Sequence, residues 1–361
     1  MKITNKVIVL GCGNGGMALA ADLKLKGAQV ALWADPAHAN KLNEIIQHKG
    51  NIFFTDNEQQ HIAKLDLVSS DLTEVTEFGD ILYNCTPMPA HTPLFNKLID
   101  TLTTTQPLKL FINLSGIFSS VEQLLNTRSK DIHTTIKIFD TSSFPYACRA
   151  GKSNDVYILG RKTEIAIASL FPGDNQYLDL LPESCLPTYF SRVNTIFQLG
   201  LMGTNPILHP ATVLLNARLI DQGHLFQFYQ EGLSKRTSRL HEALDNERLS
   251  LAKALGYTLT PCAEDYSKFY NGNFDTIYDI YKNSIAHSKI SAPTTLHHRF
   301  VTEDIAYGFV PLLTLAKIYN VHLPHIESLV NIFSTIMNND FYQHGRNLKG
   351  ITKQLIDELS S

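Results

Sequence analysis

The pattern of apolar and polar positions divides the chain into two parts of different character. Up to about residue 185, short runs rich in Val, Ile, Leu and Phe alternate with stretches whose apolar residues recur at helical spacing. This alternation is typical of βαβ units that build a mostly parallel sheet. The predicted strands comprise residues 6–10, 29–33, 81–85, 108–113, 135–139 and 155–159.

From about residue 191 onward the pattern changes to long segments of helical period with few strand signals. In one of them the periodic positions are Leu240, Leu244, Glu247, Leu251 and Leu255. We therefore expect an α/β domain over residues 1–188 and an all-helical domain over residues 189–361. The Pro- and Gly-containing residues 171–187 are predicted to join the two.

The first predicted strand runs into a turn, Gly11-Cys-Gly-Asn-Gly-Gly16, whose glycines match the G-x-G-x-x-G spacing of dinucleotide-binding turns. In such turns one glycine reverses the chain, one lets backbone approach a pyrophosphate, and one lets the next helix pack closely on its strand. The helix N-terminus then offers free N–H groups to the phosphates. Because any tight strand-to-helix turn favours glycine, the spacing alone is weak evidence.

An acidic residue at the end of the second strand supports a cofactor independently. Asp35 follows Gly16 by nineteen residues, where a carboxylate can accept hydrogen bonds from adenosine ribose hydroxyls. No Arg or Lys lies within residues 34–39 to neutralise a 2′-phosphate, and the next cation is Lys41, so NAD(H) is favoured over NADP(H). The alternative is a turn without ligand, with Asp35 as a helix cap. The predicted cofactor-binding residues of this region are Gly11, Gly13, Asn14, Gly15, Gly16 and Asp35.

In the helical part, His209 precedes Pro210. Proline suits the first position of a helix, so we expect a helix to begin at Pro210, with His209 at or beside its N-cap. The helix N-terminus would disfavour imidazolium by about 0.3–1 kcal/mol, and a nearby carboxylate would favour it. The two effects together would let His209 exchange protons near neutral pH. Glu303 and Asp304 are both candidates for the carboxylate, and the alternative is a capping or solvated histidine.

Composition and charge narrow the class of partner. Thirty-one basic against 34 acidic residues give a formal charge of −3, which points to small-molecule substrates and away from nucleic acid and membrane surfaces. Five dispersed cysteines without a C-x-x-C pair fit a reducing cytoplasm and indicate neither a disulfide framework nor a structural metal site. The sequence leaves a homodimer open.

Several segments in the same order resemble the octopine/nopaline (opine) dehydrogenase family over most of the chain. Besides the glycine turn, they are Phe144-Pro-Tyr-Ala-Cys-Arg149, Asn205-Pro-Ile-Leu-His-Pro210, Leu214-Leu-Asn-Ala217, Phe228-Tyr-Gln-Glu-Gly232, Glu242-Ala-Leu-Asp-Asn-Glu-Arg-Leu249 and His298-Arg-Phe-Val-Thr-Glu-Asp-Ile-Ala-Tyr-Gly308. The resemblance implies an N-terminal Rossmann-like dinucleotide-binding domain and an all-helical domain of the opine dehydrogenase type, with the active site in the cleft between them.

The resemblance also implies an activity and residue roles. The activity is NAD(P)H-dependent reductive condensation of an amino acid with an α-keto acid, such as pyruvate, to an N-(1-carboxyalkyl) amino acid, an oxidoreductase reaction at a CH–NH group without a metal. His209 corresponds to the catalytic histidine and Asp304 to its partner. Arg299 falls on an arginine associated with the cofactor. The implied substrate-binding residues are Ser143, Cys148 and Asn205.

Two alternatives remain, one among the enzymes and one from a different class. Reductases of the ketopantoate or glycerol-3-phosphate dehydrogenase type share the two-domain plan but generally use a lysine as proton donor, which here would be Lys253 or Lys282. A catalytically silent NAD-binding protein is the second alternative, because three positions depart from the family pattern. Residues 113–120 replace a loop rich in Pro and Gly, Ser142-Ser143 replaces an acid followed by Thr, and Arg218 stands where glycine is common.

Overall fold

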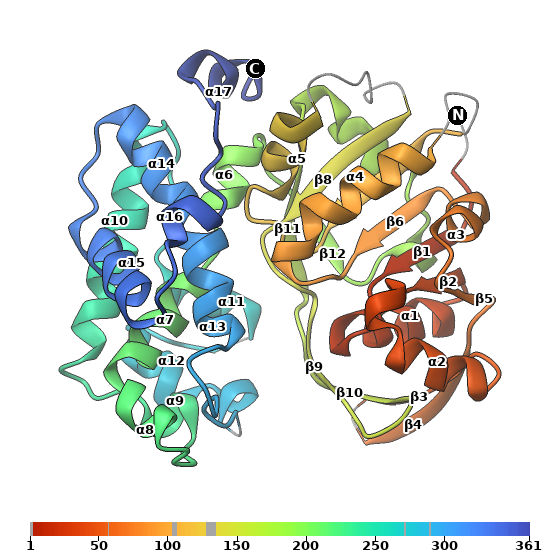
Figure 1. Ribbon diagram of the computed structural model, residues 1–361, viewed down its shortest axis with the longest axis horizontal. Coiled ribbons are helices and arrows are strands. Elements are labelled where there is room, and N and C mark those ends of the chain that lie inside the picture. Colours follow the sequence, from red (N-terminus) through yellow and green to blue (C-terminus); the bar gives the residue numbers. More distant parts are fainter. Residues whose placement is uncertain (1–2, 57, 103–106, 128–134, 271, 289) are drawn as a thin grey trace. The chain divides into compact units, whose positions relative to one another are not determined.

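The computed structural model describes residues 3–56, 58–102, 107–127, 135–270, 272–288 and 290–361. The chain forms two compact units (Figure 1), Met1–Leu199 with Asp357–Ser361, and Gly200–Ile356. The predicted domain limits of 1–188 and 189–361 stay a prediction. Among the described residues, no helix combines the length and the apolar character needed to cross a bilayer, and no group of three His, Cys, Asp or Glu side chains is arranged to hold a metal ion.

The first unit is built on an eight-stranded sheet in the order β12-β11-β8-β7-β6-β1-β2-β5. All neighbouring strands run parallel except β8 and β11. The strands are β1 (Lys6–Leu10), β2 (Gln29–Trp33), β5 (Leu67–Ser69), β6 (Ile81–Asn84), β7 (Lys109–Asn113), β8 (Ile136–Thr141), β11 (Glu164–Ser169) and β12 (Tyr189–Arg192). Strands β6 and β7 are buried at every residue, as expected for a parallel sheet covered on both faces. The predicted mostly parallel sheet is confirmed.

Helices and short 3₁₀ segments connect these strands. They are α1 (Asn14–Leu25), η1 (Pro36–His38), α2 (Asn40–Gln47), α3 (Leu72–Phe78), η2 (Met88–Ala90), α4 (His91–Thr101), α5 (Ser119–Thr127), η3 (Pro172–Leu180) and η4 (Glu183–Cys185). Helix α1 ends before Gly27, whose φ of +94° is the left-handed conformation that favours glycine. Residues 171–187, predicted to join the domains, instead connect β11 to β12 inside the first unit.

A second sheet, which the sequence pattern did not predict, packs against α1. Its order is β4-β3-β10-β9, and its strands are β3 (Asn51–Asp56), β4 (Gln59–Lys64), β9 (Tyr146–Ala150) and β10 (Asp155–Arg161). The predicted strand at 155–159 therefore belongs to this sheet, because β10 pairs with β9 and β3. Helix α1 contacts strands of both sheets and is buried from Gly16 to Leu23.

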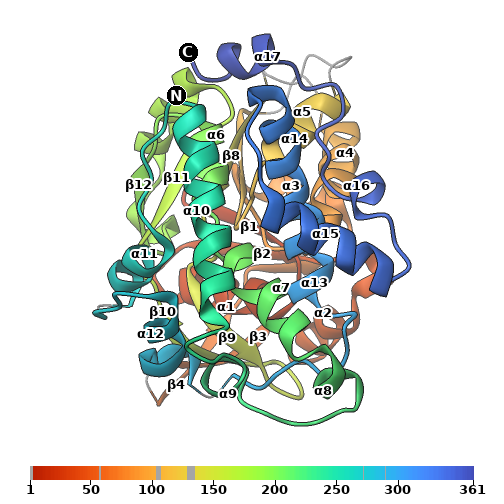
Figure 2. The same cartoon turned by 90° about the vertical axis from the view of Figure 1, so that its left-hand side faces the viewer.

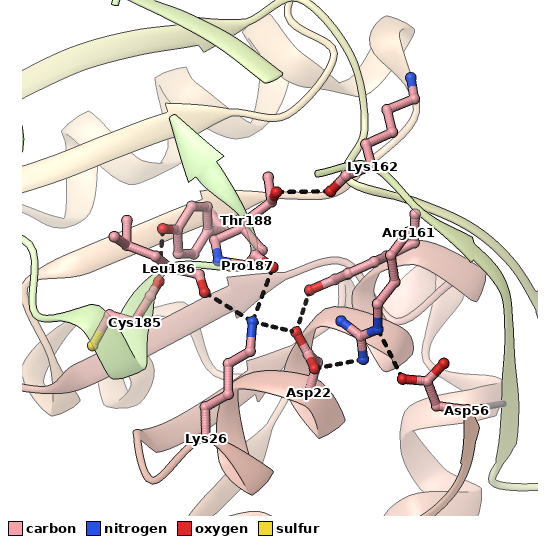
Figure 3. Close-up of polar contacts among 11 residues, drawn as sticks. Asp22, Lys26, Asp56, Arg161, Lys162, Cys185, Leu186, Pro187 and Thr188 are labelled. Carbon is pink, nitrogen blue, oxygen red and sulfur yellow. Dashed lines mark hydrogen bonds and ion pairs between the residues drawn. The ribbon is translucent and has the colours of Figure 1, made fainter. Parts of the chain in front are cut away.

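Polar contacts join the C-terminal part of α1 to the second sheet (Figure 3). The buried Asp22 carboxylate accepts from Arg161 Nη2 at 2.8 Å and from Tyr146 Oη at 2.5 Å, and Arg161 Nε also donates to Asp56 at 2.8 Å. Burial alone would raise the pKa of Asp22, but the hydrogen bonds from Arg161 and Tyr146 outweigh it and lower this pKa. A carboxylate that neutralises Arg161 in this way fixes the orientation of α1, and therefore of the glycine turn at its start.

The second unit is helical (Figure 2), with α10 running along it and contacting α7, α14 and α15. The periodic positions predicted from Leu240 to Leu255 lie in α10 and at its C-cap, and Gly256 follows with a φ of +88°. The helices are α6 (Ile196–Leu201, which spans the division), α7 (Asn205–Leu215), α8 (Ala217–Asp221), α9 (Phe228–Glu231), α10 (Ser238–Ala254), α11 (Cys262–Phe269), α12 (Ile277–Asn283), η5 (Ile285–His287), α13 (Arg299–Thr302), the π-helix η6 (Asp304–Phe309), α14 (Val310–Tyr319), α15 (Pro324–Ile336), α16 (Phe341–His344) and α17 (Lys353–Glu358).

Candidate active site

The glycine turn between β1 and α1 has the geometry of a phosphate cradle. Gly11 has a φ of +111°, and a Cβ there would lie 3.1 Å from the Cys85 carbonyl carbon. A Cβ on Gly16 would lie 1.7 Å from the Gly11 oxygen, so this glycine permits the helix to pack on its strand. A Cβ on Gly13, the N-cap of α1, would meet nothing within 4 Å. The turn therefore leaves open space where the first N–H groups of α1 are available, which fits a pyrophosphate.

Asn14 and Gly15 of the turn contact the segment that follows β8. Asn14 Oδ1 accepts from the Ala150 N–H at 3.1 Å. A Cβ on Gly15 would lie 2.6 Å from Phe144 Cζ, so the Phe144 ring leaves no room for a side chain there. The structure thus places Phe144 against the glycine turn, although about 130 residues separate them in sequence.

Asp35 lies two residues beyond β2, and both of its carboxylate oxygens have partners. Oδ1 accepts from the Ala37 N–H at 3.0 Å, which caps η1, and Oδ2 accepts from Lys97 Nζ at 2.6 Å. The hydrogen bond from Lys97 lowers the pKa of Asp35. Each oxygen has a second lone pair, so the cap and a hydrogen bond to a ribose hydroxyl are compatible.

NAD(H) was favoured because no cation lies near Asp35 in the sequence, but the structure places Lys97 beside it. Lys97 comes from α4, 62 residues after Asp35, so the sequence around Asp35 gives no sign of it. Lys41, the cation that the sequence suggested, donates instead to the carbonyls of Gly151, Lys152 and Ser153. A cation is therefore present beside Asp35, but it is not the nearest one in sequence.

His209 does not lie where the sequence predicted. Helix α7 begins at Asn205 with Thr204 as its N-cap, and Pro206 occupies the first turn that Pro210 was expected to start. Pro210 lies inside the helix. Because proline has no N–H, the helical hydrogen bond from residue 210 to the Pro206 carbonyl cannot form. His209 is consequently in the second turn, outside the range in which a helix terminus acts strongly on a charge. The prediction of an N-cap position for His209 was wrong.

His209 and Asp304 form a buried pair. The distance from His209 Nδ1 to Asp304 Oδ2 is 2.7 Å, and both side chains are buried. Asp304 is the first residue of η6, and π-helical turns occur frequently at functional sites. A Cβ on Gly308 would lie 2.4 Å from Pro206 Cγ, so this glycine lets η6 approach α7 closely enough for the pair to form. Glu303, the other candidate for the carboxylate partner of His209, pairs with Arg299, with 3.7 Å between Glu303 Oε2 and Arg299 Nη2.

Aromatic residues enclose the ring of His209. Phe300 stacks on it at 3.9 Å between centroids, and Phe228 meets it edge-on. Tyr229 Oη lies 2.8 Å from His209 Nε2. Tyr229 was not among the predicted site residues, although it lies in Phe228-Tyr-Gln-Glu-Gly232, one of the segments that resemble the family.

The other predicted residues lie on several elements. Arg299, the first residue of α13, is exposed and is on the same helical segment as Asp304, and Asn205 is the first residue of α7. In the first unit, Cys148 is buried on β9, and Ser143 accepts a hydrogen bond from Lys162 Nζ. Burial lowers the pKa of Lys162 to about 8. Among the predicted site residues, His209 and Asp304 are the pair that the structure joins by a side-chain hydrogen bond.

Ser115 and Ser142, which lie where the sequence departs from the family pattern, form hydrogen bonds within the first unit. Lys282, one of the two lysines considered as a proton donor, also has a hydrogen-bond partner. Ser115 N–H donates to Thr141 Oγ1, and Ser142 Oγ accepts from the Ala166 N–H. Lys282 Nζ donates to the Gln230 carbonyl, so its charge is used in packing α12 against α9.

Comparison with known proteins extends these observations. A family model described as NAD/NADP octopine/nopaline dehydrogenase, alpha-helical domain, matches residues 192–337. The opine dehydrogenase of Arthrobacter sp. (strain 1C) is 29% identical over 341 residues, covering 94% of this chain and 93% of that protein. A solved octopine dehydrogenase in complex with NADH and agmatine has a TM-score of 0.75 at 18% identity, covering 98% of each chain. A yersinopine dehydrogenase with NADP⁺ bound has a TM-score of 0.72 at 14% identity, covering 99% of this chain and 98% of the other.

A Rossmann-like unit with a glycine turn after its first strand, followed by a helical unit, defines the class of two-domain NAD(P)-dependent oxidoreductases. The predicted α/β plus all-α fold is confirmed. Within that class, residues 192–337 match the octopine/nopaline dehydrogenase helical-domain model, and the whole chain is similar in sequence to an opine dehydrogenase and in fold to an octopine dehydrogenase.

The open space at Gly13 gives a prediction about cofactor binding. Because a Cβ at Gly13 meets no protein atom within 4 Å, the Gly13→Ala variant should fold as the wild type does. The same methyl group would intrude on the space where a pyrophosphate approaches the backbone, so NADH affinity should fall tenfold or more, about 1.4 kcal/mol. Fluorescence titration with NADH and a thermal melt measure the two effects.

The matched control for this variant is Gly173→Ala, whose Cβ would also meet nothing within 4 Å. This control should keep both the affinity and the melting temperature. Unchanged NADH affinity in Gly13→Ala would contradict the assignment of this turn as the phosphate cradle.

Proposed function

We propose that this protein catalyses the reductive condensation of an amino acid with an α-keto acid, such as pyruvate, to an N-(1-carboxyalkyl) amino acid. The observation that carries the proposal is the buried pair of His209 and Asp304, held 2.7 Å apart in a helical unit that matches the opine dehydrogenase family. A nicotinamide cofactor bound at the glycine turn supplies the hydride that reduces the imine carbon. Binding both substrates together offsets much of the entropic cost of a two-substrate condensation.

We assign His209 the proton transfers of the condensation. The amine must lose a proton before it attacks the keto carbon, and the hydroxyl of the resulting adduct must gain one before water leaves. Asp304 orients the imidazole through Nδ1 and stabilises its cation, which is the role that a carboxylate plays beside other catalytic histidines. Ser143, Cys148 and Asn205 are proposed to contact substrate, and Arg299 the cofactor, as the family resemblance implies.

For the cofactor we propose that NADH is preferred and that NADPH is also accepted. Asp35 supports the first part, because its carboxylate can accept from ribose hydroxyls and would repel a 2′-phosphate. Lys97 supports the second part, because its ammonium lies 2.6 Å from Asp35 Oδ2 and is largely exposed. An exposed ammonium group can turn from the carboxylate to a phosphate at low cost.

The activity is tested by following NADH oxidation with each amino acid in combination with pyruvate, oxaloacetate or 2-oxoglutarate. The wild type should oxidise NADH with at least one pair. His209→Ala should lower turnover about 10²–10⁴-fold, because it removes the proton-transfer group, and should leave NADH affinity nearly unchanged. Wild-type protein that binds NADH but reacts with none of the pairs would contradict the proposed function. An equal loss of affinity and turnover in His209→Ala would contradict the role of His209.

The cofactor proposal is tested with Lys97→Met and two fluorescence titrations, one with NADPH and one with NADH. We expect NADPH affinity to fall tenfold or more, in line with about 1.5–3 kcal/mol for a hydrogen bond to a charged group. NADH affinity should change about twofold or less, because the 2′-hydroxyl carries no charge. Lys268→Met is the control, because Lys268 forms an ion pair of similar exposure with Glu264 in the other unit. If Lys97→Met weakens both cofactors equally, Lys97 does not discriminate between them.

A further inference from the structure

Both ring nitrogens of His209 are occupied. Nδ1 lies 2.7 Å from Asp304 Oδ2, and Nε2 lies 2.8 Å from Tyr229 Oη. The ring also stacks on Phe300 at 3.9 Å. In this arrangement no nitrogen of His209 is available to a substrate.

The direction of these hydrogen bonds follows from the chemistry of the three groups. An ionised carboxylate only accepts, so His209 Nδ1 carries the hydrogen that is donated to Asp304. In the neutral imidazole Nε2 is then an acceptor, and the Tyr229 hydroxyl donates to it. Burial raises the pKa of Tyr229 well above its usual value, which keeps this hydroxyl protonated.

The number of hydrogen bonds each group can make decides which atom meets the substrate. Nε2 has a single lone pair, so it cannot bond Tyr229 and a substrate at the same time. A tyrosine hydroxyl donates one hydrogen bond and accepts others, and no described residue other than His209 hydrogen-bonds to Tyr229 Oη. Burial does not decide which of the two residues meets the substrate, because both are buried, His209 at 6% exposed and Tyr229 at 2% exposed.

We propose that Tyr229 is a further catalytic residue, whose hydroxyl relays protons between His209 Nε2 and the reacting substrate. The proposal rests on the condensation activity proposed above. In this relay His209 becomes the imidazolium that Asp304 stabilises, and the Tyr229 hydroxyl contacts the substrate.

The relay balances in both directions. In the first, an N–H bond of the substrate ammonium breaks and its proton goes to Tyr229 Oη, while the tyrosine's own proton passes to His209 Nε2. The products are a neutral amine, a neutral phenol and an imidazolium paired with Asp304. In the second, Tyr229 protonates the hydroxyl of the carbinolamine, and the proton on Nε2 passes to the tyrosine oxygen. That carbinolamine arises when one N–H proton of the first adduct moves to its oxygen. The C–O bond then breaks, water leaves, and the nitrogen lone pair forms a protonated imine, which carries the positive charge.

Packing holds the Tyr229 ring in place for this role. Its centroid lies 4.7 Å from that of His287, 4.8 Å from Tyr281 and 5.2 Å from Phe228. Tyr281 is a second buried tyrosine in the same cluster, but its hydroxyl donates to the Leu208 carbonyl at 2.6 Å and contacts Thr212 Oγ1 at 2.7 Å. Tyr281 therefore provides a control for the loss of a buried hydroxyl that is not bonded to His209.

The experiment compares Tyr229→Phe, Tyr281→Phe and the double variant His209→Ala/Tyr229→Phe with the wild type. Single-turnover NADH oxidation is measured with the substrate pair found in the screen, together with NADH titration and a thermal melt. Tyr229→Phe should lower the rate about 10²–10⁴-fold while keeping NADH affinity. The double variant should be no slower than His209→Ala, because residues that act as one unit are not additive. Tyr281→Phe should stay within about threefold of the wild type.

Three results would overturn the relay while leaving the proposed function in place. The first is a Tyr229→Phe rate within about threefold of the wild type, which would mean that substrate displaces Tyr229 and meets His209 directly. The second is an equal loss in Tyr281→Phe, which would assign the effect to packing. The third is a double variant whose two losses multiply. Wild-type protein inactive with every substrate pair would instead overturn the proposed function, and the relay with it.

Discussion

The reaction that we propose for this protein depends on one buried hydrogen bond, between His209 Nδ1 and Asp304 Oδ2 at 2.7 Å. The bond joins residues 95 positions apart, so it requires α7 and η6 to pack at a fixed separation. Gly308 makes that separation possible, because any side chain there would collide with Pro206. A buried carboxylate that lost its partner would carry an uncompensated charge, so the helical packing and the hydrogen-bonded pair stabilise each other.

The two units contribute different kinds of specificity. The first unit offers backbone groups for cofactor binding. Gly11 turns the chain, Gly16 lets α1 pack on β1, and the space at Gly13 is open to a phosphate. The polar contacts of Asp22 hold the other end of α1. Such a cradle fits many dehydrogenases, because it recognises a part of the cofactor that takes no part in the reaction. The second unit offers side chains, the hydrogen-bonded His209, Asp304 and Tyr229, to which we assign the proton transfers of the proposed reaction.

The sequence predicted what depends on local order. Strands β1 and β2, the helical period of α10 and the stop at Gly27 follow from spacing within one element, and the structure has them where they were expected. The choice of Asp304 over Glu303 came from the family resemblance, because both carboxylates suit the same spacing. The start of α7 was missed, since either Pro206 or Pro210 could open a helix and only packing decides between them.

Contacts between distant segments were beyond the sequence pattern. Lys97 reaches Asp35 from another helix, and Tyr229 reaches His209 from α9. The second sheet also depends on such contacts, because β10 pairs with β3 from about a hundred residues earlier. Hydrophobic period carries no information on which elements meet. For Tyr229 the one available signal was its place in a segment shared with the family.

We propose that this chain joins an amino acid to a keto acid through a C–N bond and reduces the resulting imine with hydride from the nicotinamide. The most direct test of this proposal is mass spectrometry of the product made from an amino acid, a keto acid and NADH deuterated at the transferred position. We expect an N-(1-carboxyalkyl) amino acid with one deuterium on the former keto carbon. A deuterated 2-hydroxy acid, with the amino acid unchanged, would contradict the proposal.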